Sequence, residues 1–172
     1  LTLIEMGFKN SIFTRNQPFT FILKTNNSID NIFNSFHSKW RNQLKKSQQY
    51  NHTFKMGNND KILSRFLNLH DEMCEIKKTK QLKLRSQDLM LLKRKMGKNL
   101  QIIISELDGI DVAGCAILIS KQKAYYLYAA ANETGRKHDS SNGMVWFLIE
   151  YLVKNGFEEL DTSGVDPYKF WG

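Results

Sequence analysis

Hydrophobic positions follow two periods along the chain, and the change between them separates a helical first part from a strand-rich second part. Before residue 97, apolar residues recur mostly at spacings of three and four, as on one face of a helix. This spacing predicts helices over 27–47, around 62–73, and over 86–96. The aromatic and β-branched stretch over 18–25 instead predicts a first strand.

After Gly97 the pattern becomes that of strands. Three apolar runs, over 100–107, 111–120 and 124–131, are separated by short turns and predict an antiparallel meander. A helix capped at Ser140 or Ser141 and ended at Gly156 follows, and then a strand over 157–161. We therefore expect an α/β (α+β) fold, with helices packed on a mixed, largely antiparallel sheet.

Composition describes an ordinary globular domain. The 172 residues include 41% hydrophobic and 24% charged side chains, so the sequence predicts one domain over 1–172 that buries a core. The chain begins without Met and without a signal-peptide pattern. We expect a cytoplasmic fragment of a longer protein, in which residues 1–17 form an edge segment of undefined structure.

Charge and cysteine content narrow the partners and the compartment. The formal net charge of +8 favours polyanionic partners such as phosphate-rich substrates, RNA or a membrane surface. The two cysteines, Cys74 and Cys115, stand in apolar contexts. We expect both to be buried, reduced thiols, as is usual in the cytoplasm.

Several common catalytic motifs are missing. The sequence has no G-x-x-x-x-G-K-[ST], G-x-G-x-x-G or G-x-S-x-G pattern, so it lacks the usual phosphate cradles and nucleophile elbow. His70 and Cys74 stand one helical turn apart, but zinc takes three or four ligands. We expect no metal site and assign this pair to an ordinary helix surface with a buried cysteine.

A polar, basic loop over 132–141 joins the third strand of the meander to the next helix. The start of a helix offers unpaired N–H groups and the positive end of its dipole, which favour an anion. We expect the donor-binding residues here to be Arg136, Ser141, Asn142 and Gly143. The alternative is an ordinary capped surface loop.

Four segments in this order resemble the FemAB family: "FHSKWRNQLKKS", "DVAGCAILI", "NGMVWFLIEYLVKNG" and "FEELDTSGVDP". The resemblance covers most of the chain from Pro18 onward. It departs from the family pattern at Ser47, where Ala is usual, and at the "DTSGVDP" turn, where two adjacent glycines are common. It implies the fold of the GNAT acyltransferase superfamily, and one of the two such domains that the family carries.

The resemblance also implies amide-bond formation, with no permanently bound cofactor. Family members pass an amino acid from aminoacyl-tRNA to the peptide of a peptidoglycan precursor, so the partners would be tRNA and a phosphate-bearing cell-wall precursor. An alternative is an acyl-CoA-dependent N-acyltransferase acting on an aminosugar or small amine. Arg136 and Gly143 are spaced wrongly for the usual CoA motif. A non-enzymatic nucleic-acid-binding module ranks last, because the aromatic residues follow core periodicity. We expect no transmembrane segment, and a peripheral membrane contact is compatible with the sequence.

Under this resemblance, two acidic residues and two basic ones are candidates for the site. Asp166 or Asp161 would orient or deprotonate the amine, or would simply be turn residues. Lys39 and Arg41 would hold the acceptor's phosphates, unless they only form a solvated basic face.

Two tyrosines complete the candidate residues. Because side chains alternate along a strand, Tyr126 and Tyr128 would share one face. That face would line the substrate cleft, although core or edge packing is an alternative for each tyrosine.

Overall fold

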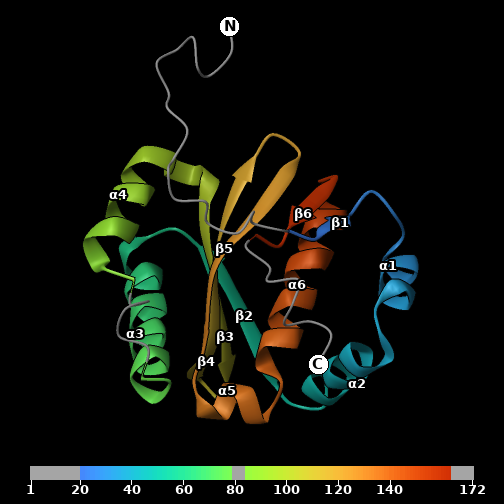
Figure 1. Cartoon of the computed structure of the whole chain (residues 1–172), viewed down its shortest axis with the longest axis horizontal. Helices are drawn as coiled ribbons and strands as arrows, with labels where there is room; N and C mark the ends of the chain where they lie inside the picture. Colours follow the sequence, from blue (N-terminus) through green and yellow to red (C-terminus); the bar gives the residue numbers. More distant parts are fainter. Residues whose placement is uncertain (1–19, 79–83, 164–172) are drawn as a thin grey trace, which may run out of the picture.

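The computed structural model describes residues 20–78 and 84–163, which form a six-stranded sheet between two layers of helices (Figure 1). The strand order is β1-β6-β5-β4-β3-β2. Every neighbouring pair is antiparallel except β5 and β6, which are parallel. The predicted mixed, largely antiparallel sheet with helices packed on it is confirmed.

The elements follow the chain in the order β1-α1-α2-β2-α3-α4-η2-β3-β4-β5-α5-α6-β6. The strands are β1 (Ile22–Lys24), β2 (His52–Gly57), β3 (Leu100–Leu107), β4 (Ile110–Ser120), β5 (Lys123–Ala131) and β6 (Glu159–Asp161). The helices are α1 (Ile29–Ser35), α2 (Ser38–Ser47), α3 (Asp60–Ile76), α4 (Ser86–Met96), α5 (Glu133–Lys137) and α6 (Ser140–Lys154), with a 3-10 turn, η2 (Gly97–Asn99). No helix within the described residues is long and apolar enough to cross a membrane.

The first half differs from the prediction at two places. The helix predicted over 27–47 is divided, because His37 takes an extended conformation and its Nδ1 accepts a hydrogen bond from the backbone N–H of Lys39, at 3.2 Å. This cap starts a new helix, α2. Strand β2 was not predicted, since it is a half-exposed edge strand in which exposed Thr53 and Lys55 interrupt the apolar pattern.

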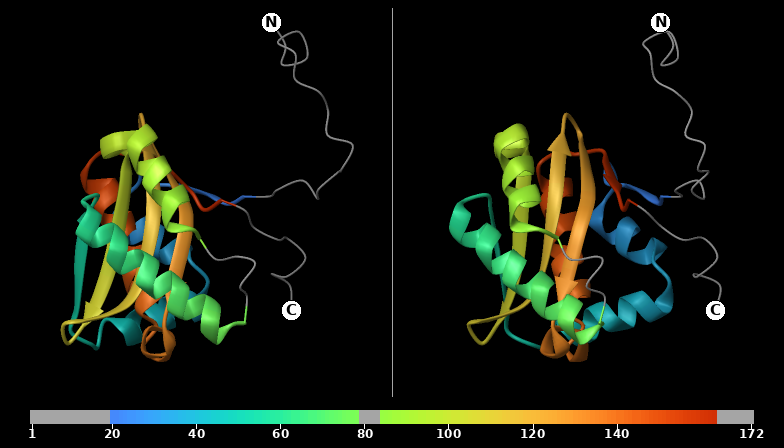
Figure 2. Two further views of the ribbon diagram at one scale, coloured as in Figure 1. Left: turned by 90° about the vertical axis from the view of Figure 1, so that its left-hand side faces the viewer. Right: turned by 60° about the vertical axis from the view of Figure 1, so that its left-hand side comes forward.

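Helices cover both faces of the sheet (Figure 2), and each face carries its own hydrophobic core. On one face, Phe66 of α3 and Leu89 of α4 pack on Ile102 and Ile104 of β3. The opposite face is covered by α1, α2 and α6, and includes the fully buried Ile149. Burial on both sides explains why the central parts of β3 and β4 are continuous apolar runs rather than alternating ones.

Both cysteines are buried and free, which confirms the prediction. Cys115 lies in β4 beneath α6, and burial raises the pKa of its thiol to about 12. Cys74 lies near the end of α3, with its Sγ 3.6 Å from His70 Nδ1. Neither thiol has the exposure that a reactive cysteine needs.

Candidate active site

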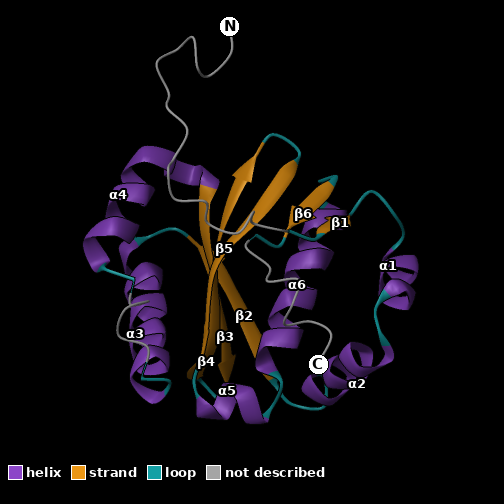
Figure 3. Ribbon diagram, in the orientation of Figure 1, coloured by secondary structure: helices purple, strands orange, loops and turns teal. Residues whose placement is uncertain are grey.

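Strand β5 loses its second neighbour part of the way along its length. β6 pairs with it only from Lys123 to Tyr125, whereas β4 accompanies it as far as Ala131. Beyond Tyr125, no strand of the described residues pairs with this edge, and β5 continues toward α5 with β4 on its other edge (Figure 3). An unpaired strand edge offers backbone N–H and C=O groups to an extended ligand. The edge over 126–131 is therefore the first part of the candidate site.

A bulge in β5 turns its tyrosines to different faces. Tyr126 lies opposite Ile117 of β4 and Tyr128 lies opposite Ala116, so Leu127 is the extra residue. Because Ile117 and Ala116 are adjacent, their partners point to opposite faces of the sheet. The expected shared face of Tyr126 and Tyr128 is therefore wrong.

The two tyrosines also differ in their surroundings. The hydroxyl of Tyr126 interacts with the thiol of Cys115, and burial raises the pKa of this phenol well above its usual value. Tyr126 is thus part of the core beneath α6. Tyr128 is 40% exposed, and its neighbour Ala129 is exposed as well. Of the two predicted residues, only Tyr128 is open to a substrate.

The segment after β5, predicted to be a loop, contains the short helix α5. Asn132 caps this helix: its Oδ1 accepts a hydrogen bond from the Gly135 N–H at 2.9 Å, and its Nδ2 donates to the Asp111 carbonyl at 3.1 Å. Gly135 packs directly on β4, since a Cβ at this position would lie 2.1 Å from the Val112 carbonyl oxygen. These contacts fix α5 against the end of β4.

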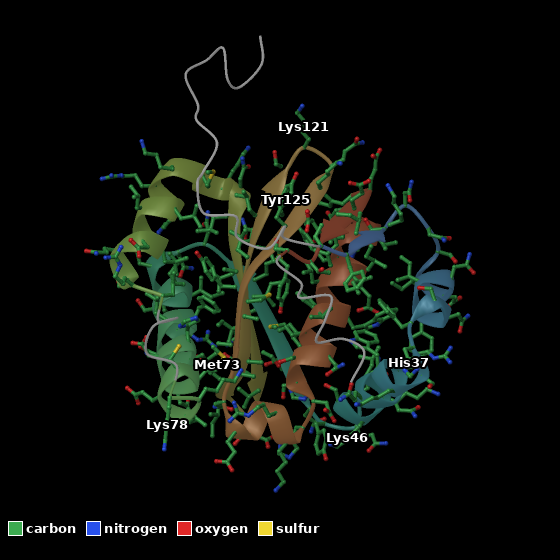
Figure 4. All side chains as sticks on the ribbon, viewed as in Figure 1. His37, Lys46, Met73, Lys78, Lys121 and Tyr125 are labelled. Carbon is green, nitrogen blue, oxygen red and sulfur yellow. The ribbon has the colours of Figure 1, made fainter. Side chains whose placement is uncertain are left out.

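Helix α6 starts one residue earlier than a serine cap would require. Its N-cap is Asp139, in the left-handed conformation at φ 51° and without a side-chain capping bond, and Ser140 is the first helical residue. The carboxylate of Asp139 instead pairs with Lys46 Nζ of α2 at 2.8 Å. Lys46 also donates to the Lys137 carbonyl at 2.9 Å. Lys46 therefore ties the end of α2 to the α5–α6 junction (Figure 4).

The predicted donor-binding residues lie around this junction but have different surroundings. Arg136 is exposed on α5, and its Nη1 donates to the Ala131 carbonyl at 3.4 Å. Ser141 and Asn142 are half-buried in the first turn of α6. Gly143 is buried against α2, where a Cβ would lie 2.6 Å from Ser47 Oγ. Its missing side chain thus makes room for a neighbouring helix.

The predicted phosphate-binding pair is separated. Lys39 lines an open pocket of about 520 Å³ beside Lys46 and Asp139, at the start of α6. Arg41 turns toward α1, with its guanidinium 5.9 Å from the Phe33 ring centroid. The structure thus brings Lys39 to the α5–α6 junction and leaves Arg41 out of this pocket. We call the pocket lined by Ser38, Lys39, Asn42, Gln43, Lys46 and Asp139 the α2 pocket.

Of the two predicted acidic residues, only Asp161 lies within the described part of the chain; Asp166 lies outside it. Asp161 is the last residue of β6 and lies opposite Tyr125, where β5 and β6 separate. Its carboxylate accepts hydrogen bonds from Thr20 Oγ1 and, at 2.8 Å, from the Ser163 N–H. This arrangement is that of an aspartate that stabilises a turn.

Sequence reasoning missed a charged network on the face covered by α3. Glu106 of β3 accepts hydrogen bonds from Lys55 Nζ at 2.7 Å and Thr53 Oγ1 at 3.1 Å, and it also pairs with Arg65, which contacts Asp111 as well. The hydrogen bond from Lys55 is the largest cause that lowers the pKa of Glu106. A lone acid in an otherwise apolar strand was the signal. With its donors in place, Glu106 is held ionised and has a structural role.

A family model for the acetyltransferase (GNAT) domain matches residues 34–169, which include the α2 pocket, the open edge of β5 and the start of α6. No curated protein sequence matches the chain.

Several solved structures share the fold at low sequence identity. FemX has a TM-score of 0.71 at 15% identity, over 86% of this chain and 53% of FemX. The C-terminal domain of a putative lysylphosphatidylglycerol synthetase from Agrobacterium fabrum has a TM-score of 0.63 at 12% identity, over 86% and 46%. An aminoglycoside acetyltransferase from an uncultured soil metagenomic sample has a TM-score of 0.54 at 16% identity, over 70% and 81%. The chain spans about half the length of the first two.

Proposed function

The chain belongs to the acetyltransferase (GNAT) domain family, a family of acyltransferases, and from this premise we propose that it forms an amide bond by FemAB-like aminoacyl transfer. The donor is an aminoacyl-tRNA. The acceptor is an amine on a phosphate-bearing cell-wall precursor.

The observation that carries this proposal is the position of the open edge of β5. This edge begins where Tyr125 leaves its partner Asp161 and ends where Asn132 caps α5. An acceptor peptide can add to such an edge through backbone hydrogen bonds. The α2 pocket, with the ammonium groups of Lys39 and Lys46, lies at the α5–α6 junction beyond it. Phosphates of either substrate are suited to this basic pocket.

The chemistry requires little beyond orientation and charge stabilisation. The amine, after losing a proton to solvent, attacks the ester carbonyl carbon. The C–N bond forms, the C–O bond to the tRNA ribose breaks, and the ribose oxygen takes up a proton. Backbone N–H groups on the open edge are suited to stabilise the tetrahedral oxyanion. Asp161 would help by holding the turn at the start of this edge, because its carboxylate is already engaged.

The alternative is transfer from acyl-CoA to an aminosugar or small amine. The same open edge would suit the extended arm of such a donor, and this is the observation in its favour. Against it, α5 occupies the connection where a glycine-rich phosphate loop would be needed, and Gly143 packs on Ser47. We therefore rank it second.

One experiment separates the two donors. The full chain is incubated with a muramyl-pentapeptide nucleotide precursor or an aminoglycoside, each with either aminoacyl-tRNA or acetyl-CoA. The mass of the acceptor is then measured. We expect the precursor to gain one aminoacyl group from aminoacyl-tRNA. Transfer from acetyl-CoA alone would support the alternative, and no transfer from either donor would contradict both.

A matched pair of variants tests the α2 pocket. Lys46→Ala removes the ammonium that pairs with Asp139, and we expect it to raise the KM for the phosphate-bearing substrate. Lys45→Ala removes an exposed charge from the same helix, outside that pocket. Equal KM values for the two variants would remove the α2 pocket from the site.

A further inference from the structure

Helix α4 exposes large apolar side chains to solvent. Met90, Leu91 and Met96 are 41%, 46% and 38% exposed. Met90 and Leu91 help to line a shallow groove of about 620 Å³ together with Arg94 and Lys98. Three exposed, large apolar side chains on one helix of 11 residues differ from the singly scattered apolar residues of an ordinary protein surface.

The same surface is strongly basic. Arg94, Lys95 and Lys98 are exposed, and none of them forms an ion pair with a described residue, whereas the neighbouring Lys93 pairs with Asp60. The pairing of Leu100 with Leu118 places the β4–β5 turn, with exposed Lys121, at the same end of the sheet. Both views in Figure 2 show α4 and this turn at one end of the molecule.

We propose that this surface docks the protein on a membrane that contains anionic phospholipid. We call it the α4 surface, and its residues are Met90, Leu91, Arg94, Lys95, Met96 and Lys98. Helices that lie at a bilayer interface combine basic residues with apolar ones that enter the acyl boundary. The charge of the α4 surface is complementary to that of anionic lipid headgroups. This inference does not depend on the proposed function.

A nucleic acid is the competing partner for a basic surface, and the composition of α4 disfavours it. Proteins that bind single strands alternate basic residues with aromatic ones on which bases stack. The sequence of α4, "SQDLMLLKRKM", has no aromatic residue. Contact with a phosphate backbone stabilises exposed methionine and leucine little, whereas their entry into a bilayer lowers the free energy of the system. The exposed residues of α4 therefore favour the lipid.

Vesicle co-sedimentation of the full chain tests the proposal. One set of vesicles is phosphatidylcholine, and the other contains equal parts of phosphatidylcholine and phosphatidylglycerol. We expect binding to the second set only. The triple variant Arg94→Ala, Lys95→Ala, Lys98→Ala should bind about 100-fold more weakly, since each basic residue near an anionic surface contributes roughly fivefold. Leu91→Gln should weaken the binding that persists at high salt.

The control carries the same change of charge on other elements. Lys61→Ala, Lys77→Ala and Lys154→Ala together remove three exposed cations outside the α4 surface, and this variant should keep most of the binding. Circular dichroism shows whether each variant is folded. Equal losses in the two triple variants, or equal binding to both vesicle sets, would overturn the proposal. So would a failure to bind vesicles together with tight binding of tRNA that depends on Arg94, Lys95 and Lys98.

Discussion

Ser47 of α2 and Gly143 of α6 meet so closely that a Cβ on the glycine would lie 2.6 Å from the serine Oγ. Ser47 is buried, and its hydroxyl has no hydrogen-bond partner among the described residues. The contact fixes α2, with its basic pocket, against the first turn of α6. It also explains why small residues stand at both positions.

This contact predicts strong coupling between two substitutions. Gly143→Ala should lower the free energy of unfolding by about 1–3 kcal/mol, because the added methyl group overpacks the interface. Ser47→Ala should be neutral or stabilising, since it removes a buried, unpaired hydroxyl. In the double variant the nearest remaining atoms lie at 3.4 and 3.6 Å, so most of the loss should be recovered. Urea unfolding of the four proteins measures the coupling, and additive effects would contradict it.

Gly135→Ala should destabilise the chain more than Gly143→Ala. The methyl group would lie 2.1 Å from a backbone carbonyl oxygen of Val112, and a central strand cannot move aside as a side chain can. We expect a loss of about 3 kcal/mol. Thr134→Ala is the control, because Thr134 is exposed on the same short helix and should stay within about 0.5 kcal/mol of the parent. Similar melting temperatures for the two variants would show that α5 is not held on β4.

The network around Glu106 predicts a loss of stability in acid. Its pKa is lowered from 4.5, chiefly by the hydrogen bond from Lys55. A lowered carboxyl pKa contributes stability that is fully present above the unfolded value and is lost as the pH falls through the folded one. Glu106→Gln should therefore cost roughly 1 kcal/mol at neutral pH and should flatten the fall in stability below pH 4.5. The exposed Glu133→Gln is the control; an unchanged pH profile in Glu106→Gln would contradict the assignment.

Both thiols should be unreactive in the folded protein. Cys115 is fully buried with a pKa of about 12, and Cys74 is buried in α3. Because only the thiolate attacks a disulfide reagent, a chromogenic disulfide should react slowly at neutral pH. After unfolding in urea, both thiols of each chain should react at once. Rapid reaction of either thiol in the folded chain would show that α3 or the sheet core opens easily.

Much of the second half of the fold was predictable, because its long apolar runs are bounded by clear turn residues. The meander of β3, β4 and β5 and the helix α6 follow from local pattern and turn residues alone. Strand β2 was missed because it is a short edge strand with one face in solvent. Its exposed Thr53 and Lys55 alternate with too few apolar residues to form a recognisable strand pattern. His37 divided a continuous helical period by capping α2. The spacing of apolar residues along the sequence reveals neither effect.

The candidate site was less predictable than the fold, because tertiary contacts decide it. The bulge at Leu127 reversed the face of Tyr128, and no residue type in the sequence marks that bulge. Lys39 and Arg41 stand two apart, which places them on different sides of a helix, so only Lys39 reaches the α2 pocket. Lys46, which ties α2 to the α5–α6 junction, was not among the predicted site residues. Its partner, Asp139, lies far away in the sequence.

The length of strand β5 also sets the distance between the α4 surface and the other end of the sheet. It runs from the turn beside the α4 surface to the helix α5 at the other end of the sheet (Figure 1). Nine residues of strand span about 30 Å. A molecule resting on a bilayer by its α4 surface would hold the α2 pocket roughly one strand length above the lipid headgroups. A lipid-linked acceptor would then have to extend along β5 to reach the α2 pocket. The length of this strand would therefore set the minimum length of the acceptor.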